Sequence, residues 1–83
     1  MATEIKMPQW AMTLSEGAVT EWLKKPGDTV RIGDALCIIE EAKTVGELSS
    51  TADGVLLKTC VDIDDIVPVL TTICWIGHPG ETV

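Results

Sequence analysis

The chain is predicted to fold as an all-β domain, a flattened barrel or sandwich of two pseudo-twofold-related four-stranded antiparallel sheets. Three observations predict this fold class. Short segments of strand-forming residues recur between turn signals, no ten-residue segment combines a helical apolar period with end caps, and the second half of the sequence repeats the pattern of the first. Short strands at this spacing are typical of sandwiches and barrels, and we expect essentially no helix.

The strands of the first half are separated by residues that favour turns. They are expected at residues 3–7, 18–23, 29–32, 35–39 and 45–48. The strongest turn signal is Lys24-Lys25-Pro26-Gly27-Asp28, because proline fixes one backbone torsion and glycine supplies a positive φ. A second turn is expected at Gly33-Asp34.

The chain then begins again. Residues 17–40, moved forward by 37 positions, fall on residues 54–77, and this pairs Gly17 with Gly54, Asp28 with Asp65, Val30 with Val67, Cys37 with Cys74 and Ile39 with Ile76. Two similar halves predict two sheets packed face to face about a pseudo-twofold axis. Gly27 becomes Asp64 and Gly33 becomes Leu70 in the second half, so the turn near Leu70 is expected either to differ or to be strained.

Composition limits the possible functions. With 46% hydrophobic residues, the chain can bury a small core without a metal or a disulfide. Cys37, Cys60 and Cys74 show no Cys-x-x-Cys spacing and are expected to be reduced core residues. A net charge of −7 argues against nucleic acid as a partner. Without a signal-like start or an apolar run near the roughly 20 residues that span a bilayer, a cytoplasmic, monomeric domain that does not bind membranes is expected.

The five-residue stretch Glu40-Glu41-Ala42-Lys43-Thr44 is expected to be a tight turn between two strands. A lysine at the tip of such a turn is suited to covalent attachment of a cofactor, although a solvated surface lysine is the simpler interpretation. The repeat is broken here, because the second half has residues 78–81 at the corresponding place and then ends. The pseudo-twofold therefore predicts that the lysine turn and the two termini lie at opposite ends of the domain.

Several residue pairs resemble a known family at their observed spacings. Met7-Pro8, Glu16-Gly17, Trp22-Leu23, Gly27-Asp28 and Gly33-Asp34 resemble the lipoyl domain of dihydrolipoamide acyltransferases, which are components of 2-oxo acid and acetoin dehydrogenase complexes. The resemblance indicates a carrier domain over residues 1–77, with residues 78–83 as the start of a flexible linker or tail. It implies the same paired-sheet fold, with lipoate attached covalently to Lys43.

The turn itself departs from the family pattern, which is Glu-Thr-Asp-Lys-Ala or Glu-Ser-Asp-Lys-Ala. Glu40 and Lys43 match, Ala42 replaces the aspartate and Thr44 follows the lysine. The related biotin carriers have methionine on both sides of their lysine, so lipoate is expected rather than biotin. Glu40, Glu41, Ala42 and Thr44 are expected to be recognition residues, with simple solubility as the alternative for the two glutamates.

The resemblance implies a swinging-arm carrier that is not itself an enzyme. A lipoate–protein ligase would modify Lys43, and the arm would then visit a thiamine-diphosphate-dependent decarboxylase, an acyltransferase core domain and dihydrolipoamide dehydrogenase. The His-x-x-x-Asp signature of the acyltransferase is absent, since Thr82 follows His78 four residues on. Two alternatives stay open: a biotin carrier of a carboxylase, and an unmodified binding or assembly domain, which Ala42 and Leu70 favour.

Overall fold

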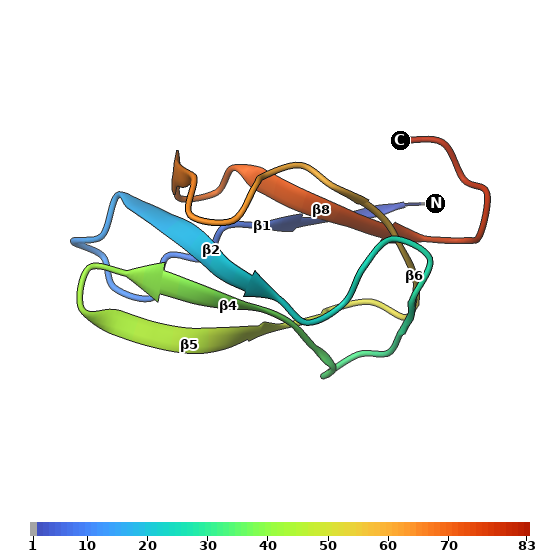
Figure 1. Cartoon of the computed structure of the whole chain (residues 1–83), viewed down its shortest axis with the longest axis horizontal. Helices are drawn as coiled ribbons and strands as arrows, with labels where there is room; N and C mark the ends of the chain where they lie inside the picture. Colours follow the sequence, from blue (N-terminus) through green and yellow to red (C-terminus); the bar gives the residue numbers. More distant parts are fainter. Residues whose placement is uncertain (1) are drawn as a thin grey trace.

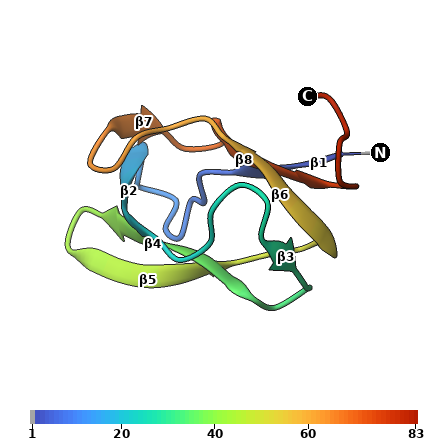
Figure 2. The same ribbon diagram turned by 45° about the vertical axis from the view of Figure 1, so that its right-hand side comes forward.

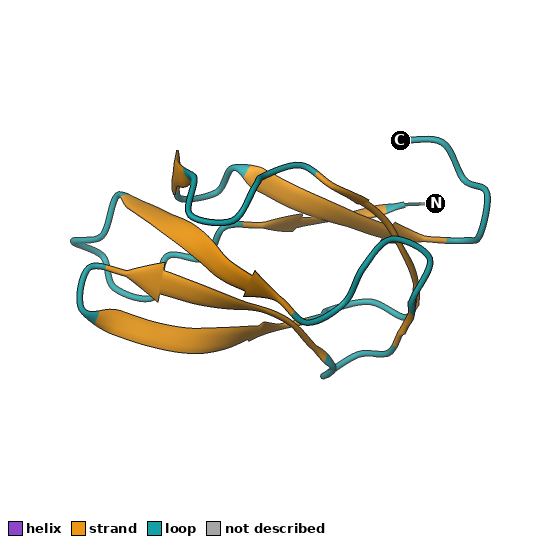
Figure 3. Ribbon diagram, viewed as in Figure 1, coloured by secondary structure: helices purple, strands orange, loops and turns teal. Residues whose placement is uncertain are grey.

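The structure is a computed structural model that describes residues 2–83, and the regular structure within them is entirely β (Figures 1 and 3). The strands are β1 (Thr3–Lys6), β2 (Glu16–Trp22), β3 (Thr29–Val30), β4 (Ala35–Glu41), β5 (Thr44–Ser49), β6 (Gly54–Thr59), β7 (Ile66–Pro68) and β8 (Thr72–Gly77). The predicted fold class is confirmed. The largest differences from the predicted strands are at three strands: β2 begins two residues earlier and ends one residue earlier, β3 is two residues shorter at its end, and β4 runs two residues further into the lysine turn.

Two four-stranded sheets lie against each other, with the orders β1-β8-β6-β3 and β5-β4-β2-β7. All neighbouring strands are antiparallel. Figure 2 shows that β3, from the first half of the sequence, lies at the sheet edge beside β6, and that β7, from the second half, lies at the sheet edge beside β2. The two halves are therefore interleaved, and neither could form its sheet without the other.

The pseudo-twofold extends to individual backbone hydrogen bonds. The shift of 37 residues carries β2, β3 and β4 onto β6, β7 and β8. The Gly27 N–H donates to the Leu56 carbonyl at 2.8 Å, and the matching Asp64 N–H donates to the matching Val19 carbonyl, also at 2.8 Å. Each turn is thus hydrogen-bonded to the opposite half, which explains why both halves have turns at the same positions.

The second turn shows how the protein accommodates the loss of a glycine. Gly33 has φ 93° and Leu70 has φ 69°, so Leu70 keeps the left-handed torsion that favours glycine. The reason is that the Leu70 N–H must reach the Met7 carbonyl at 2.8 Å, as the Gly33 N–H reaches that of Ser50 at 2.9 Å. Of the two predicted possibilities for Leu70, strain is the one observed.

The core lies between the two sheets and is aliphatic. Its fully or nearly fully buried side chains are Ile5, Met7, Val19, Val30, Leu36, Cys37, Ile39, Leu56, Ile73, Cys74 and Ile76. Burial raises the pKa of the Cys37 and Cys74 thiols to about 12. The prediction that Cys60 is also a core residue is wrong, because it follows the end of β6 and is exposed.

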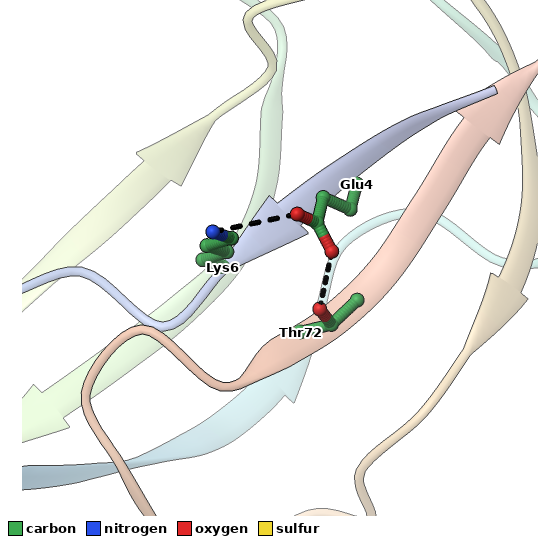
Figure 4. A network of polar contacts seen from close by, with 3 residues as sticks. All are labelled: Glu4, Lys6 and Thr72. Atoms are coloured by element: carbon green, nitrogen blue, oxygen red, sulfur yellow. Dashed lines mark hydrogen bonds and ion pairs between the residues drawn. The ribbon is translucent and has the colours of Figure 1, made fainter. Parts of the chain in front are cut away.

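The edge strand β1 is fastened to β8 by polar side chains as well as by the sheet (Figure 4). The Thr72 hydroxyl donates to Glu4 Oε2 at 2.7 Å, and the Lys6 ammonium lies 3.4 Å from Glu4 Oε1. The Thr72 hydrogen bond, and after it Lys6, hold the pKa of Glu4 below its ordinary value. These contacts fix the strand that carries the chain into the loop before β2.

The domain is elongated, 36 Å along its longest axis and 20 Å across. The turn between β4 and β5 lies at one end and both chain ends lie at the other, as the pseudo-twofold predicts (Figure 1). The tail after β8 folds back, because the Glu81 N–H donates to the His78 carbonyl and the His78 N–H donates to Glu81 Oε1, each at 3.0 Å. Residues 2–83 include no helix of the length and apolarity needed to cross a membrane.

Candidate functional site

The lysine turn is tighter than the five-residue stretch predicted from the sequence. Glu41 of β4 pairs with Thr44 of β5, so only Ala42 and Lys43 form the loop of a two-residue hairpin. Ala42 has φ 52°, whereas Lys43 keeps a negative φ. A positive φ at the first of two loop residues is typical of a type II′ hairpin, which usually has glycine there. Ala42 therefore holds a torsion that an alanine adopts only at a cost of roughly 1–2 kcal/mol.

Lys43 is exposed at the tip of this hairpin. Among residues 2–83 its side chain makes no ion pair or hydrogen bond. The amine is thus presented without a competing partner, on a rigid support of two paired strands. This arrangement suits an attachment point, since an incoming protein need not break any contact to reach Nζ.

Glu40 points to the outer face of the β5-β4-β2-β7 sheet and is exposed. In register it lies between Val45 of β5 and Ala18 of β2. Together with Ala42, it lines a hollow of about 140 Å³ beside the hairpin, whose other walls are Glu16, Gly17, Ala18 and Ile66. Glu40, Ala42 and Thr44 are all exposed around Lys43, so the predicted recognition residues other than Glu41 gather on one accessible end.

Glu41 lies in the interior, with no exposed surface. The solubilising role that the sequence left open for this glutamate is wrong, because its side chain points between the sheets. Its Oε1 accepts a hydrogen bond from the Trp10 N–H at 3.2 Å, while its Oε2 has no partner. If Glu41 takes part in recognition, it must act through the positions of its neighbours and not by direct contact.

Gly17 makes the space for this carboxylate. A Cβ at Gly17 would lie 2.8 Å from Glu41 Cγ and 3.1 Å from its Oε2, and also 3.0 Å from the sulfur of Met7. The Glu-Gly pair at the start of β2 therefore belongs to the lysine site, although the two segments are far apart in sequence.

Trp10 brings the loop of residues 8–15, here named the Trp10 loop, against the same hairpin. Its indole ring covers Gly46 of β5, where a Cβ would be 3.1 Å from Trp10 Cη2. Within the loop, the Gln9 side-chain amide donates to the Leu14 carbonyl at 2.9 Å and to that of Met12 at 3.4 Å. The loop is thus closed on itself and touches the hairpin through Trp10, as one unit.

Sequence reasoning missed the buried carboxylate, although a signal was present. In β4 the side chains of Cys37, Ile39 and Glu41 alternate, and the first two are apolar residues that face inward. Extending the strand by two residues would have placed Glu41 inward as well. The contacts of Trp10 with Gly46 and Glu41 have no comparable signal, because a loop residue follows no period.

The chain is similar to known proteins over nearly its whole length. A family described as "Biotin-requiring enzyme" matches residues 3–76. The chain is 37% identical, over 99% of its length, to the dihydrolipoyllysine-residue acetyltransferase component of the pyruvate dehydrogenase complex of Corynebacterium glutamicum. It is 35% identical, over its full length, to the corresponding component of the acetoin cleaving system of Bacillus subtilis. It spans only 12% and 21% of these two proteins.

A solved structure shows the same fold. It is the lipoyl domain of the 2-oxoglutarate dehydrogenase complex from Azotobacter vinelandii, with a TM-score of 0.74 and 30% sequence identity. The match covers 93% of this chain and 98% of that domain, so the two correspond almost from end to end. The chain therefore belongs to the biotin- and lipoyl-attachment family, and within that family it is a lipoyl domain.

Proposed function

We propose that Lys43 is the residue to which lipoate is attached, and that the domain carries acyl groups and reducing equivalents within a 2-oxo acid or acetoin dehydrogenase complex. The observation that supports this most directly is the unpaired, exposed Lys43 at the tip of a two-residue hairpin, at the end of a lipoyl domain opposite both termini. The names of the relatives, which include pyruvate, acetoin and 2-oxoglutarate systems, support the class of complex without selecting one substrate.

The residues present fit a covalently bound lipoyl group. Amide formation needs an accessible amine, and no other group of the domain has to take part in the chemistry. A lipoate–protein ligase would supply the acyl group as a mixed anhydride and accept a proton from the Lys43 ammonium, because only the neutral amine is a nucleophile. The amine nitrogen then bonds to the acyl carbon, the anhydride C–O bond breaks, and a second proton leaves the nitrogen. The net charge changes from −7 to −8.

The bound dithiolane would supply the redox and acyl-transfer chemistry, and the chain's own residues would position it. The proposed partners after the ligase are a thiamine-diphosphate-dependent decarboxylase, an acyltransferase core domain and dihydrolipoamide dehydrogenase. The domain acts as a carrier and not as an enzyme: β4 and β5 hold the attachment point, and exposed Glu40 and Thr44 flank it on the surface that a partner would contact.

Intact mass spectrometry after co-expression with a lipoate–protein ligase tests the proposal. A mass increase of one lipoyl group is expected in the wild type and in Lys58→Gln, which removes an exposed lysine from β6 on the other sheet. The increase is expected to be absent in Lys43→Gln. Modification of a different lysine, or none, would contradict the proposal, and a mass increase with a biotin ligase alone would identify a biotin carrier.

A further inference from the structure

The lysine site contains a buried acidic side chain that attachment does not require. Glu41 has no exposed surface, and only one of its two carboxylate oxygens has a hydrogen-bond partner. Leaving a buried carboxylate oxygen without a partner reduces stability, whereas an apolar side chain of similar length would avoid this penalty. Gly17 must in addition lack a side chain to make room for it. A position that is unfavourable for folding in two ways suggests a role other than stability.

The one hydrogen bond that Glu41 makes identifies that role. Its Oε1 accepts from the backbone N–H of Trp10, at 3.2 Å and 31 residues away in sequence. Among residues 2–83, this is the one hydrogen bond between the Trp10 loop and β4, the strand that leads to Lys43. The second contact of Trp10 is its ring against Gly46, three residues after Lys43.

Because the Gln9 amide closes the Trp10 loop on itself, fixing one residue of the loop fixes the others. Met12, which is 96% exposed, is held out by the same loop. A protein that contacts the β4–β5 hairpin in order to reach Lys43 would therefore also contact the neighbouring Trp10 loop.

We propose that Glu41 is a positioning residue: its buried carboxylate holds the Trp10 loop against the lysine hairpin, so that a protein acting on Lys43 contacts the two segments as one preformed surface. The inference rests on the proposed function of Lys43 and adds a residue to it. Glu41 touches neither the ligase nor the lipoyl group. Without it, the loop would have to be ordered at each encounter, which weakens docking and leaves the chemical step unchanged.

Glu41→Met separates positioning from stability. Methionine fills a similar space but cannot accept the Trp10 N–H, and it has no orphaned oxygen. We expect the variant to unfold at the same temperature as the wild type or higher, while the Trp10 amide resonance shifts in an ¹H–¹⁵N NMR spectrum. In lipoylation kinetics with a lipoate–protein ligase, the KM for the domain should rise about tenfold with kcat unchanged.

Two further variants complete the experiment, one as a control and one as an independent displacement of the Trp10 ring. Glu41→Gln keeps an oxygen that can accept from Trp10 and should stay within about twofold of the wild-type KM, because the N–H···O bond is retained. Gly46→Ala leaves Glu41 intact but puts a Cβ 3.1 Å from Trp10 Cη2, so the ring must move and KM should rise. Gly46→Ala also tests the proposal if Glu41→Met fails to fold.

The outcomes are distinguishable. A Glu41→Met domain with the wild-type KM, or with an unmoved Trp10 amide, overturns the positioning role even though the proposed function stands. If the wild-type domain is not lipoylated at all, the proposed function fails, and the Trp10 amide alone then decides whether Glu41 holds the loop.

Discussion

The two halves of the domain are built alike, and a matched pair of glycines shows where they differ. Gly17 and Gly54 are related by the shift of 37 residues, and each leaves no room for a side chain. At Gly17 the space is taken by the side chain of Glu41, next to the lysine hairpin. At Gly54 it is taken by the backbone carbonyl of Gly77, whose oxygen would lie 2.6 Å from an added Cβ, near the chain ends.

The same fold position therefore has two purposes. In the second half the glycine allows β6 to approach the backbone of Gly77 in β8 closely. In the first half it accommodates a particular carboxylate that reaches the Trp10 loop. The matched position thus serves backbone packing near the chain ends and accommodates a side chain of the lysine site at the opposite end.

Alanine at the two glycines should give unequal losses of stability. Gly54→Ala is expected to destabilise the domain by about 3 kcal/mol or more, because the new Cβ meets fixed backbone and Gly54 has φ 152°. Gly17→Ala is expected to cost about 1–3 kcal/mol, since a side chain can shift. Urea unfolding of both variants measures the difference. Equal losses would mean that the carboxylate is held as rigidly as the backbone.

Shortening Glu41 should rescue one glycine variant and not the other. Adding Glu41→Ala to Gly17→Ala removes both Glu41 atoms that the new Cβ would meet and leaves only the Met7 sulfur, so the double variant should be more stable than the sum of the single effects by about 0.5–3 kcal/mol. In Gly54→Ala the same change should simply add. A double-mutant cycle from urea unfolding gives both coupling energies, and coupling at Gly54 would refute the local explanation.

At the turn that contains Leu70, matched substitutions in the two halves are expected to change the free energy of unfolding in opposite directions, and by less than the glycine variants above. Leu70→Asn should stabilise the domain by about 0.5–1 kcal/mol, because asparagine tolerates the left-handed torsion. Leu70 is 62% exposed and loses little packing. Gly33→Ala at the matching position should destabilise by about 1 kcal/mol. Thermal unfolding tests the pair, and stabilisation by Gly33→Ala would show that the two turns differ more than their torsions indicate.

The smallest effect is expected at the edge strand β1. The folded pKa of Glu4 lies below its ordinary value, so its ionised form stabilises the fold above pH 4.5, and this contribution is lost as pH falls through the folded pKa. Glu4→Gln should therefore be slightly less stable than the wild type at pH 7, and the two should converge in acid. Thermal unfolding from pH 7 to pH 3 measures this, and a difference that grows in acid would contradict the sign.

Turn signals and the internal repeat were sufficient to predict most of the fold. Strand-forming segments between turn signals predicted the strands, and the shift of 37 residues predicted the paired sheets and the opposite placement of Lys43 and the termini. The conformation of Leu70 could not be chosen in advance, because it depends on a hydrogen bond to Met7 in the other half.

The candidate site was only partly accessible to sequence reasoning. The position of Lys43 at a hairpin tip followed from its place between two strands. The expectation for Cys60 failed because its position is exposed in both halves: the shift of 37 residues pairs Cys60 with Leu23, which is also exposed. The contact of Trp10 with Gly46 joins a loop to a strand 36 residues away, and such contacts are set by tertiary packing alone.

The separation of Lys43 from both termini has a consequence for kinetics. Any segment that continues from either end of the chain would start at the far end of a body 36 Å long, so the domain itself would extend the reach of a group attached to Lys43. A group confined to a sphere of that radius has a local concentration on the order of 10 mM. At such concentrations even a weak contact between the carrier and a tethered partner would be frequently occupied, and rapid release would matter more than tight binding.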